Sequence, residues 1–209
     1  MWGRTWGEIA LDLLLPETCA HCREDLPPPL RGPLCGTCLL DLQPGNGAGA
    51  AFAYDGPVPA MVRAFKFEGR RRVGESLAAW MAGLWSRQTA LGRPHAFVPV
   101  PLHRKRERIR GFNQARILAL AVARQAGIPV LEALVRTRNT APQRGRSRNK
   151  RLNNLGGAFA VRDGLRLKGS RLVLIDDVLT TGGTLAECAR VLKEAGAADV
   201  RSYVLARRG

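Results

Sequence analysis

The strongest structural signal in this chain is the stretch Leu172-Val-Leu-Ile-Asp-Asp-Val-Leu-Thr-Thr-Gly-Gly-Thr184. Its continuous apolar run, 172–175, is typical of a central strand that is buried on both faces of a parallel sheet. Two adjacent carboxylates follow the run, and a turn rich in threonine and glycine then opens a helix. Ligands of open α/β sheets bind at the carboxyl ends of strands. The stretch therefore predicts an α/β fold with a ligand site at Asp176 and Asp177.

The turn after the acids has the chemistry of a phosphate-binding loop. The backbone N–H groups of Thr181, Gly182 and Gly183 can converge on a phosphate, and the hydroxyls of Thr180 and Thr184 add donors. The two carboxylates would repel a phosphate at close range, so they need another ligand group. Ribose hydroxyls, with Mg2+ nearby, satisfy both requirements. The turn is neither a Walker A loop nor a Gly-x-Gly-x-x-Gly dinucleotide turn.

Strands alternate with helices outward from this stretch, which indicates a mostly parallel sheet with helices on both faces. We expect strands at 51–54, 97–101, 158–161, 171–175 and 200–206. We expect helices at 75–91, 113–125 and 184–195, the second closed by Gly127. Residues 44–50, Pro-Gly-Asn-Gly-Ala-Gly-Ala, indicate a flexible linker with nothing to pack. We therefore divide the chain into an N-terminal module, 1–50, and a main domain, 51–209.

Four of the five cysteines form the pattern Cys19-x2-Cys22 and Cys35-x2-Cys38. Each pair can fold into a tight knuckle, and two knuckles complete the tetrahedral sulfur shell that structural Zn2+ prefers. The module, about 16–42, is too short for a core of its own, so metal binding would supply its folding free energy. Two disulfides are the alternative, but they suit a secreted protein. His21 is an alternative ligand, and we expect the lone Cys188 to be a buried small hydrophobe.

Basic residues are concentrated in one part of the chain. The 33 Lys and Arg and 17 Asp and Glu give a net charge of +16. Residues 101–151 contain 14 basic and two acidic residues, so this segment alone carries +12. Such an excess indicates a polyanionic partner or ligand. Residues 137–151 hold six basic residues, no acidic ones and almost nothing apolar, which predicts a long loop, either disordered or a mobile flap over a ligand.

Length and composition exclude several classes of protein. A chain of 209 residues with 45% hydrophobic and 24% charged residues is neither disordered nor fibrous. It has no run of 18 uncharged apolar residues, so we expect no membrane span. Glu8 and Asp12 interrupt the apolar part of residues 1–15, which makes a poor signal peptide. We therefore expect a cytoplasmic protein with no membrane partner.

The stretch 172–184 resembles the phosphoribosyl pyrophosphate (PRPP) signature of type I phosphoribosyltransferases. Nearly the whole chain is similar to the ComF family of competence-associated proteins, in which a zinc finger precedes a phosphoribosyltransferase domain. The matching pieces are the four cysteines, Phe65-Lys66-Phe67, Val98-Pro-Val-Pro-Leu102, Arg106, Arg110-Gly-Phe-Asn-Gln114, Arg136-x-Arg138-x-Thr140 with Gln143, Arg151-x-x-Asn154 and Gly157-Ala-Phe159.

The resemblance implies a site for PRPP. Asp176 and Asp177 take the catalytic role by holding the ribose 2′ and 3′ hydroxyls. The rest of the signature lies around the 5′-phosphate: Val178, Leu179, Thr180, Thr181, Gly182, Gly183 and Thr184. The ligand would bind with Mg2+, beside a structural Zn2+ held by Cys19, Cys22, Cys35 and Cys38.

Several arginines suit the pyrophosphate of such a ligand, because guanidinium groups bind its oxygens bidentately and spread the charge that develops as it departs. Arg106, Arg108 and Arg110 follow a predicted strand, and 102–106 is our candidate for the pyrophosphate loop. Residues 137–151 would form a hood that closes over PRPP and excludes water. Further candidates in or beside the hood are Arg136, Gln143 and Arg151.

Two functions remain open from the sequence. The ComF resemblance implies a role in natural transformation, in which the protein handles incoming single-stranded DNA beside a helicase, with Phe65, Phe67, Trp2 or Trp6 stacking on bases. The alternative is a nucleobase or amine phosphoribosyltransferase of nucleotide metabolism with no DNA role. His95 and His103 are candidate general bases for it, but a histidine in a turn or on the surface is the favoured interpretation of each.

Overall fold

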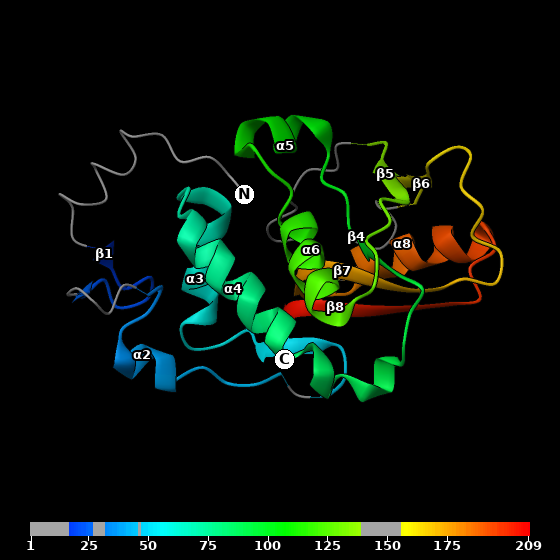
Figure 1. Cartoon of the computed structure of the whole chain (residues 1–209). Coiled ribbons are helices and arrows are strands. Elements are labelled where there is room, and N and C mark those ends of the chain that lie inside the picture. Colours follow the sequence, from blue (N-terminus) through cyan, green and yellow to red (C-terminus); the bar gives the residue numbers. More distant parts are fainter. Residues whose placement is uncertain (1–16, 27–31, 46, 139–155) are drawn as a thin grey trace.

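Four parallel strands form the centre of the protein (Figure 1). The computed structural model describes residues 17–26, 32–45, 47–138 and 156–209. The sheet has the order β3-β8-β7-β4, and its strands are β3 (Ala50–Ala53), β8 (Asp199–Arg207), β7 (Arg171–Leu179) and β4 (Ala96–Pro99). Each neighbouring pair runs parallel. The predicted α/β fold with a parallel sheet is therefore confirmed.

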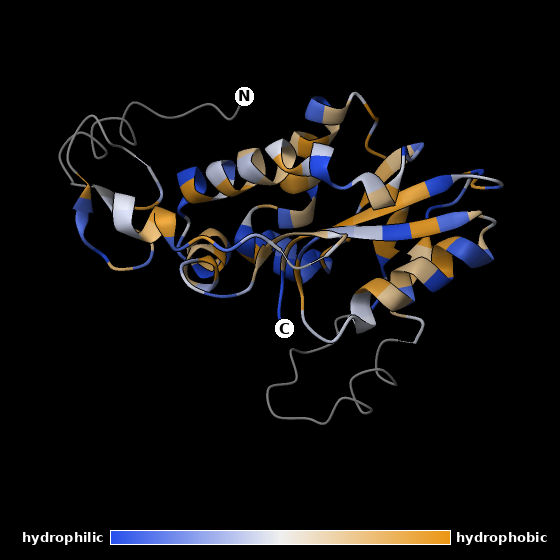
Figure 2. Cartoon of the chain, turned by 90° about the horizontal axis from the view of Figure 1, so that it is seen from below, coloured by the Kyte–Doolittle hydropathy of each residue, from blue (hydrophilic) through white to orange (hydrophobic). Residues whose placement is uncertain are grey.

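Both faces of the sheet are covered because the two central strands are apolar on both sides. Val173, Ile175 and Tyr203 belong to one buried cluster, which also contains residues of α3 (Val58–Phe67), α4 (Arg71–Gly83) and α6 (Gln114–Ala126). Leu172 and Leu174 belong to the other, with residues of α8 (Gly183–Glu194). Successive side chains of a strand point to opposite faces, which explains this division. Figure 2 shows the strands between helices on two sides.

Helix α6 is bounded as the sequence predicts. The Asn113 side chain accepts a hydrogen bond from the backbone N–H of Ala115, and Gly127 ends the helix in the left-handed conformation. Another predicted helix, 75–91, is shorter than expected: α4 ends at Gly83, and two 3-10 turns, Trp85–Arg87 and Thr89–Leu91, follow it. The apolar positions of the two segments nevertheless share one buried cluster, so the predicted stripe is a core feature.

Strand β7 is longer than predicted, and this changes how the acid pair is presented. Asp176 and Asp177 lie inside the strand, where Asp176 is opposite Val204 of β8. Pairing with β4 ends at Ile175, so the last part of β7 extends beyond that neighbour. Because strand side chains alternate in direction, the two adjacent carboxylates point to opposite sides of the sheet.

Two segments differ from the sequence analysis. Helix α3 was not expected; Pro57 is its N-cap residue, and Pro59 lies in its first turn, where the missing N–H of proline costs no helical hydrogen bond. The expectation that 44–50 has nothing to pack is wrong at its end, since Ala50 begins β3 and is 2% exposed. The backbone N–H of Gly45 also donates to the carbonyl of Ala51.

The N-terminal cysteine module lies beside the ends of α3 and α4 (Figure 1). It consists of the strand pair β1 (Glu17–Thr18) and β2 (Asp25–Leu26) and the helix α2 (Gly36–Leu40). Arg23, whose φ is 68°, donates to the Glu68 carboxylate at 3.2 Å, and Arg70 donates to the carbonyl of Thr18. The module is thus attached to the main domain by side chains of the α3–α4 connection.

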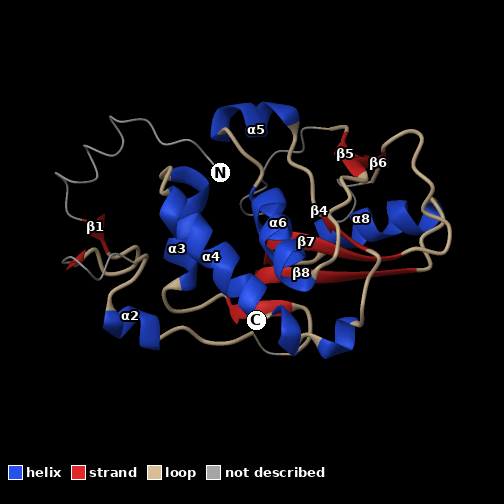
Figure 3. Ribbon diagram, viewed as in Figure 1, coloured by secondary structure: helices blue, strands red, loops and turns tan. Residues whose placement is uncertain are grey.

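A short antiparallel ribbon stands apart from the main sheet (Figure 3). It pairs β5 (Leu134–Arg136) with β6 (Phe159–Val161). Past β5, the Thr137 hydroxyl donates to the carbonyl of Gly157, and the N–H of Gly157 donates to Glu187 of α8. The predicted hood leaves from this ribbon, but most of it, with Gln143 and Arg151, lies outside the described residues. None of the helices in the described part of the chain is long and apolar enough to cross a membrane.

Candidate functional site

A cleft of about 710 Å3 opens where β7 extends beyond β4. The end of α3, the start of α6, β5 and the short helix α5 (Arg104–Arg110) surround it. Its polar lining comes from all of these elements: Lys66, Arg106, Arg110, Asn113, Gln114, Arg136, Asp176, Asp177 and Thr184. Its apolar lining includes Phe65, Phe67, Ile109, Phe112 and Val178. The cleft therefore lies at the carboxyl ends of strands, as the sequence predicts.

The acid pair has different partners on the two sides of the sheet. The Asp177 carboxylate lies 2.7 Å from Nζ of Lys66, and both side chains are largely buried. Oδ1 of Asp176 accepts a hydrogen bond from the backbone N–H of Asp177 at 2.8 Å. Burial, and then repulsion by Asp177, raise the pKa of Asp176 to about 7, against smaller opposing effects of Lys66 and Arg136. The pair can thus accept hydrogen bonds from ligand hydroxyls, but it holds a proton readily when no ligand is bound.

The turn after β7 has the backbone of an anion site. Gly182 is in the left-handed conformation with φ of 78°, and helix α8 begins directly after it. The N-cap residue, Gly182, has no side chain to cap the first turn of α8, which leaves the N–H groups of that turn to a ligand. Of the predicted turn residues, Val178 and Thr184 line the cleft, whereas Thr180 is exposed and Thr181 is half-buried.

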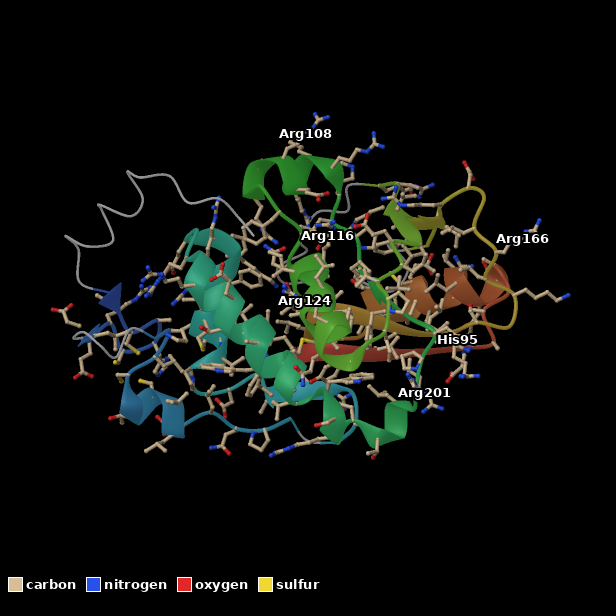
Figure 4. All side chains as sticks on the ribbon, in the orientation of Figure 1. His95, Arg108, Arg116, Arg124, Arg166 and Arg201 are labelled. Atoms are coloured by element: carbon tan, nitrogen blue, oxygen red, sulfur yellow. The ribbon has the colours of Figure 1, made fainter. Side chains whose placement is uncertain are left out.

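Of the three arginines after β4 that were predicted to bind pyrophosphate, two face the cleft. The predicted loop 102–106 is instead the start of α5, because the His103 side chain accepts from the N–H of Lys105 and caps this helix. Arg106 and Arg110 line the cleft. Arg108 is exposed, and its side chain extends outward from α5 in Figure 4. The structure therefore brings Arg106 and Arg110 to the acid pair and does not bring Arg108.

Arg110 and Arg136 are held in positions that bury their charge. Arg110 donates to Oε1 of Gln114 at 2.7 Å, and its guanidinium lies 5.0 Å from the ring centre of Phe67. Burial lowers the pKa of Arg110, and Asp177 opposes this shift. Burial, and to a smaller extent repulsion by Arg106, also lower the pKa of Arg136. Gathering these cations without a bound anion is unfavourable, so the cleft favours a polyanionic ligand.

Lys66 and Gln114 also line the cleft, although no role for either was predicted from the sequence. Lys66 belongs to the quoted Phe65-Lys66-Phe67 stretch, which gave no sign that the ammonium would reach Asp177. Gln114 is 1% exposed, and its Nε2 has no hydrogen-bond partner among the described residues. An unpaired buried amide costs about 1–3 kcal/mol, which a ligand oxygen would recover. The sequence offered one sign of a functional role for Gln114: it is a polar residue at the start of a predicted helix, directly after the capping Asn113.

The four cysteines of the N-terminal module converge as the pattern predicts. Their sulfur atoms all lie within 4.8 Å of one another, and those of Cys22 and Cys35 are 3.7 Å apart. Tetrahedral Zn2+ with bonds of about 2.3 Å separates its sulfurs by about 3.8 Å, whereas a disulfide needs about 2.05 Å. Burial raises the pKa of Cys19, but backbone N–H groups of the knuckles outweigh this and bring it to about 6. The residues fit a Zn2+ ion, and His21 is not part of the cluster.

The other candidates have structural explanations. Cys188 is fully buried in the second apolar cluster, as expected, and burial raises the pKa of its thiol. Nδ1 of His95 accepts from the backbone N–H of Arg171 at 3.2 Å, and His103 caps α5. Neither histidine is among the described residues that line the cleft. The structure therefore favours the interpretation that both are turn or surface residues over a role as general base.

Several known proteins are similar to this chain in sequence. A family model described as "Phosphoribosyl transferase domain" matches residues 113–209. Competence protein F of Haemophilus influenzae is 32% identical over 194 residues, 90% of this chain and 84% of that protein. DNA utilization protein YhgH of Escherichia coli K12 is 35% identical over 83% of this chain and 77% of that protein. Competence protein ComFC of Streptococcus pneumoniae is 30% identical over 83% and 74%.

Among solved structures, a glutamine PRPP amidotransferase from B. subtilis aligns with a TM-score of 0.48 and 18% identity. The aligned part covers 68% of this chain and 30% of that one, a likeness too low to identify a function.

The chain therefore carries a domain of the phosphoribosyl transferase type, matched over residues 113–209, and an N-terminal four-cysteine module. The relatives identify it further: the chain belongs to the ComF family, together with competence protein F, ComFC and YhgH.

Proposed function

We propose that the cleft binds Mg2+–PRPP and that the protein acts in the cytoplasm on incoming single-stranded DNA. The observation that supports this most is the convergence, in one cleft, of the acid pair, the start of α8 and a group of buried cations. A ligand with vicinal hydroxyls, a monophosphate and a pyrophosphate uses all three parts. The orphaned Nε2 of Gln114 and the crowded charges of Arg106, Arg110 and Arg136 also call for an anionic ligand.

Each group has a proposed task. Asp176 and Asp177 accept hydrogen bonds from the ribose hydroxyls, and the turn up to Thr184 holds the 5′-phosphate. Arg106 and Arg110 pair with pyrophosphate oxygens. Mg2+, when bound with the ligand, would neutralise part of the pyrophosphate charge.

If the ligand is turned over, a nitrogen nucleophile attacks C1 of the ribose and pyrophosphate leaves with the bonding electrons. Positioning and charge stabilisation would supply most of the rate enhancement. The Lys66–Asp177 ion pair would be exchanged during binding, since a ribose hydroxyl and the ammonium compete for the same carboxylate.

Calorimetric titration of Mg2+–PRPP into the full chain tests the site. We expect micromolar binding that is lost when Asp176 and Asp177 are both changed to alanine. The matched control is Asp163→Ala, which removes an exposed carboxylate outside the cleft and should bind normally. Binding that survives the double substitution would refute the site, and absence of binding by the wild type would refute the ligand.

The DNA role is supported by the names of the relatives and by the cations of α5. Competence protein F and DNA utilization protein YhgH are named for DNA-related processes. On α5, Arg104, Lys105 and Arg108 are exposed and free to face a phosphate backbone. The partner we propose for such a role is a competence helicase or another DNA-processing protein.

A nucleobase or amine transferase without a DNA role is the competing function. Binding of DNA should weaken steeply between about 50 and 200 mM salt. In the competing case no DNA binds, and pyrophosphate is released only when an acceptor is added.

A further inference from the structure

A second cavity, of about 560 Å3, lies between the cysteine module and α3. His21 of the first knuckle and Tyr54, just after β3, line it on one side. Arg63, Lys66 and Phe67 of α3 line it on the other. None of the described residues that line this cavity is acidic. It therefore combines aromatic rings with positive charge, and no residue of the stretch 172–184 lines it.

Phe67 is the most unusual residue of this cavity. Its side chain is 73% exposed at the end of a helix whose other apolar residues are largely buried. The ring lines both the second cavity and the main cleft. Arg110 lies over it at 5.0 Å and holds a cation beside the ring. An exposed aromatic ring with neighbouring cations is the usual platform on which unpaired bases stack.

Arg63 provides charge for a phosphate at the same place. Its side chain is 64% exposed, and its Nε lies 3.7 Å from Oε1 of Glu68. Glu68 is closer to Arg23 of the cysteine module, at 3.2 Å. One carboxylate thus serves two guanidinium groups, so Glu68 does not fully offset the charge of Arg63, which lines the cavity.

We infer that this second cavity holds one nucleotide of single-stranded DNA, with its base against Phe67 and Tyr54 and its phosphate at Arg63. The inference rests on the proposed DNA role and gives that role a location. Only an unpaired base offers a free face for stacking, so single-stranded DNA fits better than duplex. The cavity shares Lys66 and Phe67 with the main cleft, so the strand would continue toward the exposed cations of α5.

The test is the fluorescence anisotropy of a labelled oligothymidine of about 20 nucleotides, measured with the full zinc-loaded chain over a series of salt concentrations. Arg63→Ala should reduce the slope of log affinity against log salt by about 0.7, the value for one phosphate contact to a single strand. Phe67→Ala should weaken binding by about fivefold or more while leaving the slope unchanged, because stacking involves no counterion release. The matched control, Arg166→Ala, removes an exposed guanidinium far from the module (Figure 4) and should change neither quantity.

Both substituted side chains are largely exposed, so the variants should fold, and unchanged zinc content and melting temperature verify this. Arg63→Ala should also bind Mg2+–PRPP like the wild type, since Arg63 does not line the main cleft. If both variants bind the oligonucleotide like Arg166→Ala, this location is wrong although the DNA role stands. If Phe67→Ala weakens duplex binding equally, the stacking role is refuted. If the wild type does not bind the oligonucleotide at all, the DNA role and this inference fall together.

Discussion

Replacing Asp176 with asparagine should stabilise the ligand-free protein at neutral pH while removing its ligand site. The unfolded chain releases the Asp176 proton near pH 3.8, whereas the folded chain keeps it until about pH 7. Between these values the folded state binds more protons, so wild-type stability falls as pH rises through this range. Asparagine carries no charge at any of these pH values. It also keeps the oxygen that accepts from the N–H of Asp177.

The magnitude follows from the shift in pKa. Three pH units at about 1.36 kcal/mol each set a ceiling of about 4 kcal/mol above pH 7. Part of this is already present at pH 5, so the advantage of Asp176→Asn should grow by roughly 2–3 kcal/mol between about pH 5 and pH 8. For a chain of this size that corresponds to about 5–10 °C in melting temperature.

Thermal unfolding followed by circular dichroism at about pH 5, 6, 7 and 8 measures this difference. Asp163→Asn, on an exposed turn, controls for the loss of a negative charge and should show no such growth. Adding Mg2+–PRPP should raise the melting temperature of the wild type and not that of Asp176→Asn. A difference between variant and wild type that stays constant with pH would refute the reasoning.

Four further substitutions test other parts of the structure. Asp177→Ala should abolish PRPP binding by calorimetry with unchanged zinc content, and normal PRPP binding would show that the acid pair is misassigned. Cys35→Ser should lose the metal, measured by atomic emission, because three thiolates leave the tetrahedral shell open; full zinc retention would contradict the four-cysteine site. Gln114→Leu should weaken PRPP binding about tenfold, because Arg110 loses the hydrogen bond to Gln114 that holds it in place. The melting temperature should change little, because the substitution also removes an unpaired buried amide. Tyr203→Phe should cost about 1 kcal/mol in urea unfolding, since the hydroxyl donates to the buried carbonyl of Met81 at 2.7 Å, and an unchanged midpoint would refute that bond's contribution.

Local patterns were sufficient for the central strand of the sheet and for the cysteine cluster. The apolar run before Asp176 predicts a central strand because a strand that is buried on both faces has apolar residues at every position, without alternating polar ones. Asn113 and Gly127 bound α6 correctly because capping depends on neighbouring residues only. The cysteine spacing predicts a sulfur cluster because each knuckle is likewise formed by residues that are neighbours in the sequence.

Features that depend on distant contacts were missed. The Lys66–Asp177 pair joins α3 to β7, and no spacing within either segment shows that they meet. Residues 104–110 have no apolar stripe, so nothing in them predicts the helix that turns Arg108 away from the cleft. Ala50 looks like a linker residue until β8 pairs with it through the carbonyl of Gly49 and the N–H of Val204.

The pairing of β3 with β8 also constrains when the sheet can form during synthesis. Strand β3 ends at Ala53, and β8, its only neighbour among the described strands of this sheet, begins at Asp199. A ribosome adds about 5–20 residues per second, so β3 waits many seconds before its partner leaves the exit tunnel. During that interval the apolar surface of β3, including Phe52, has no strand beside it. Nascent chains of this protein should therefore depend on chaperones until β8 emerges.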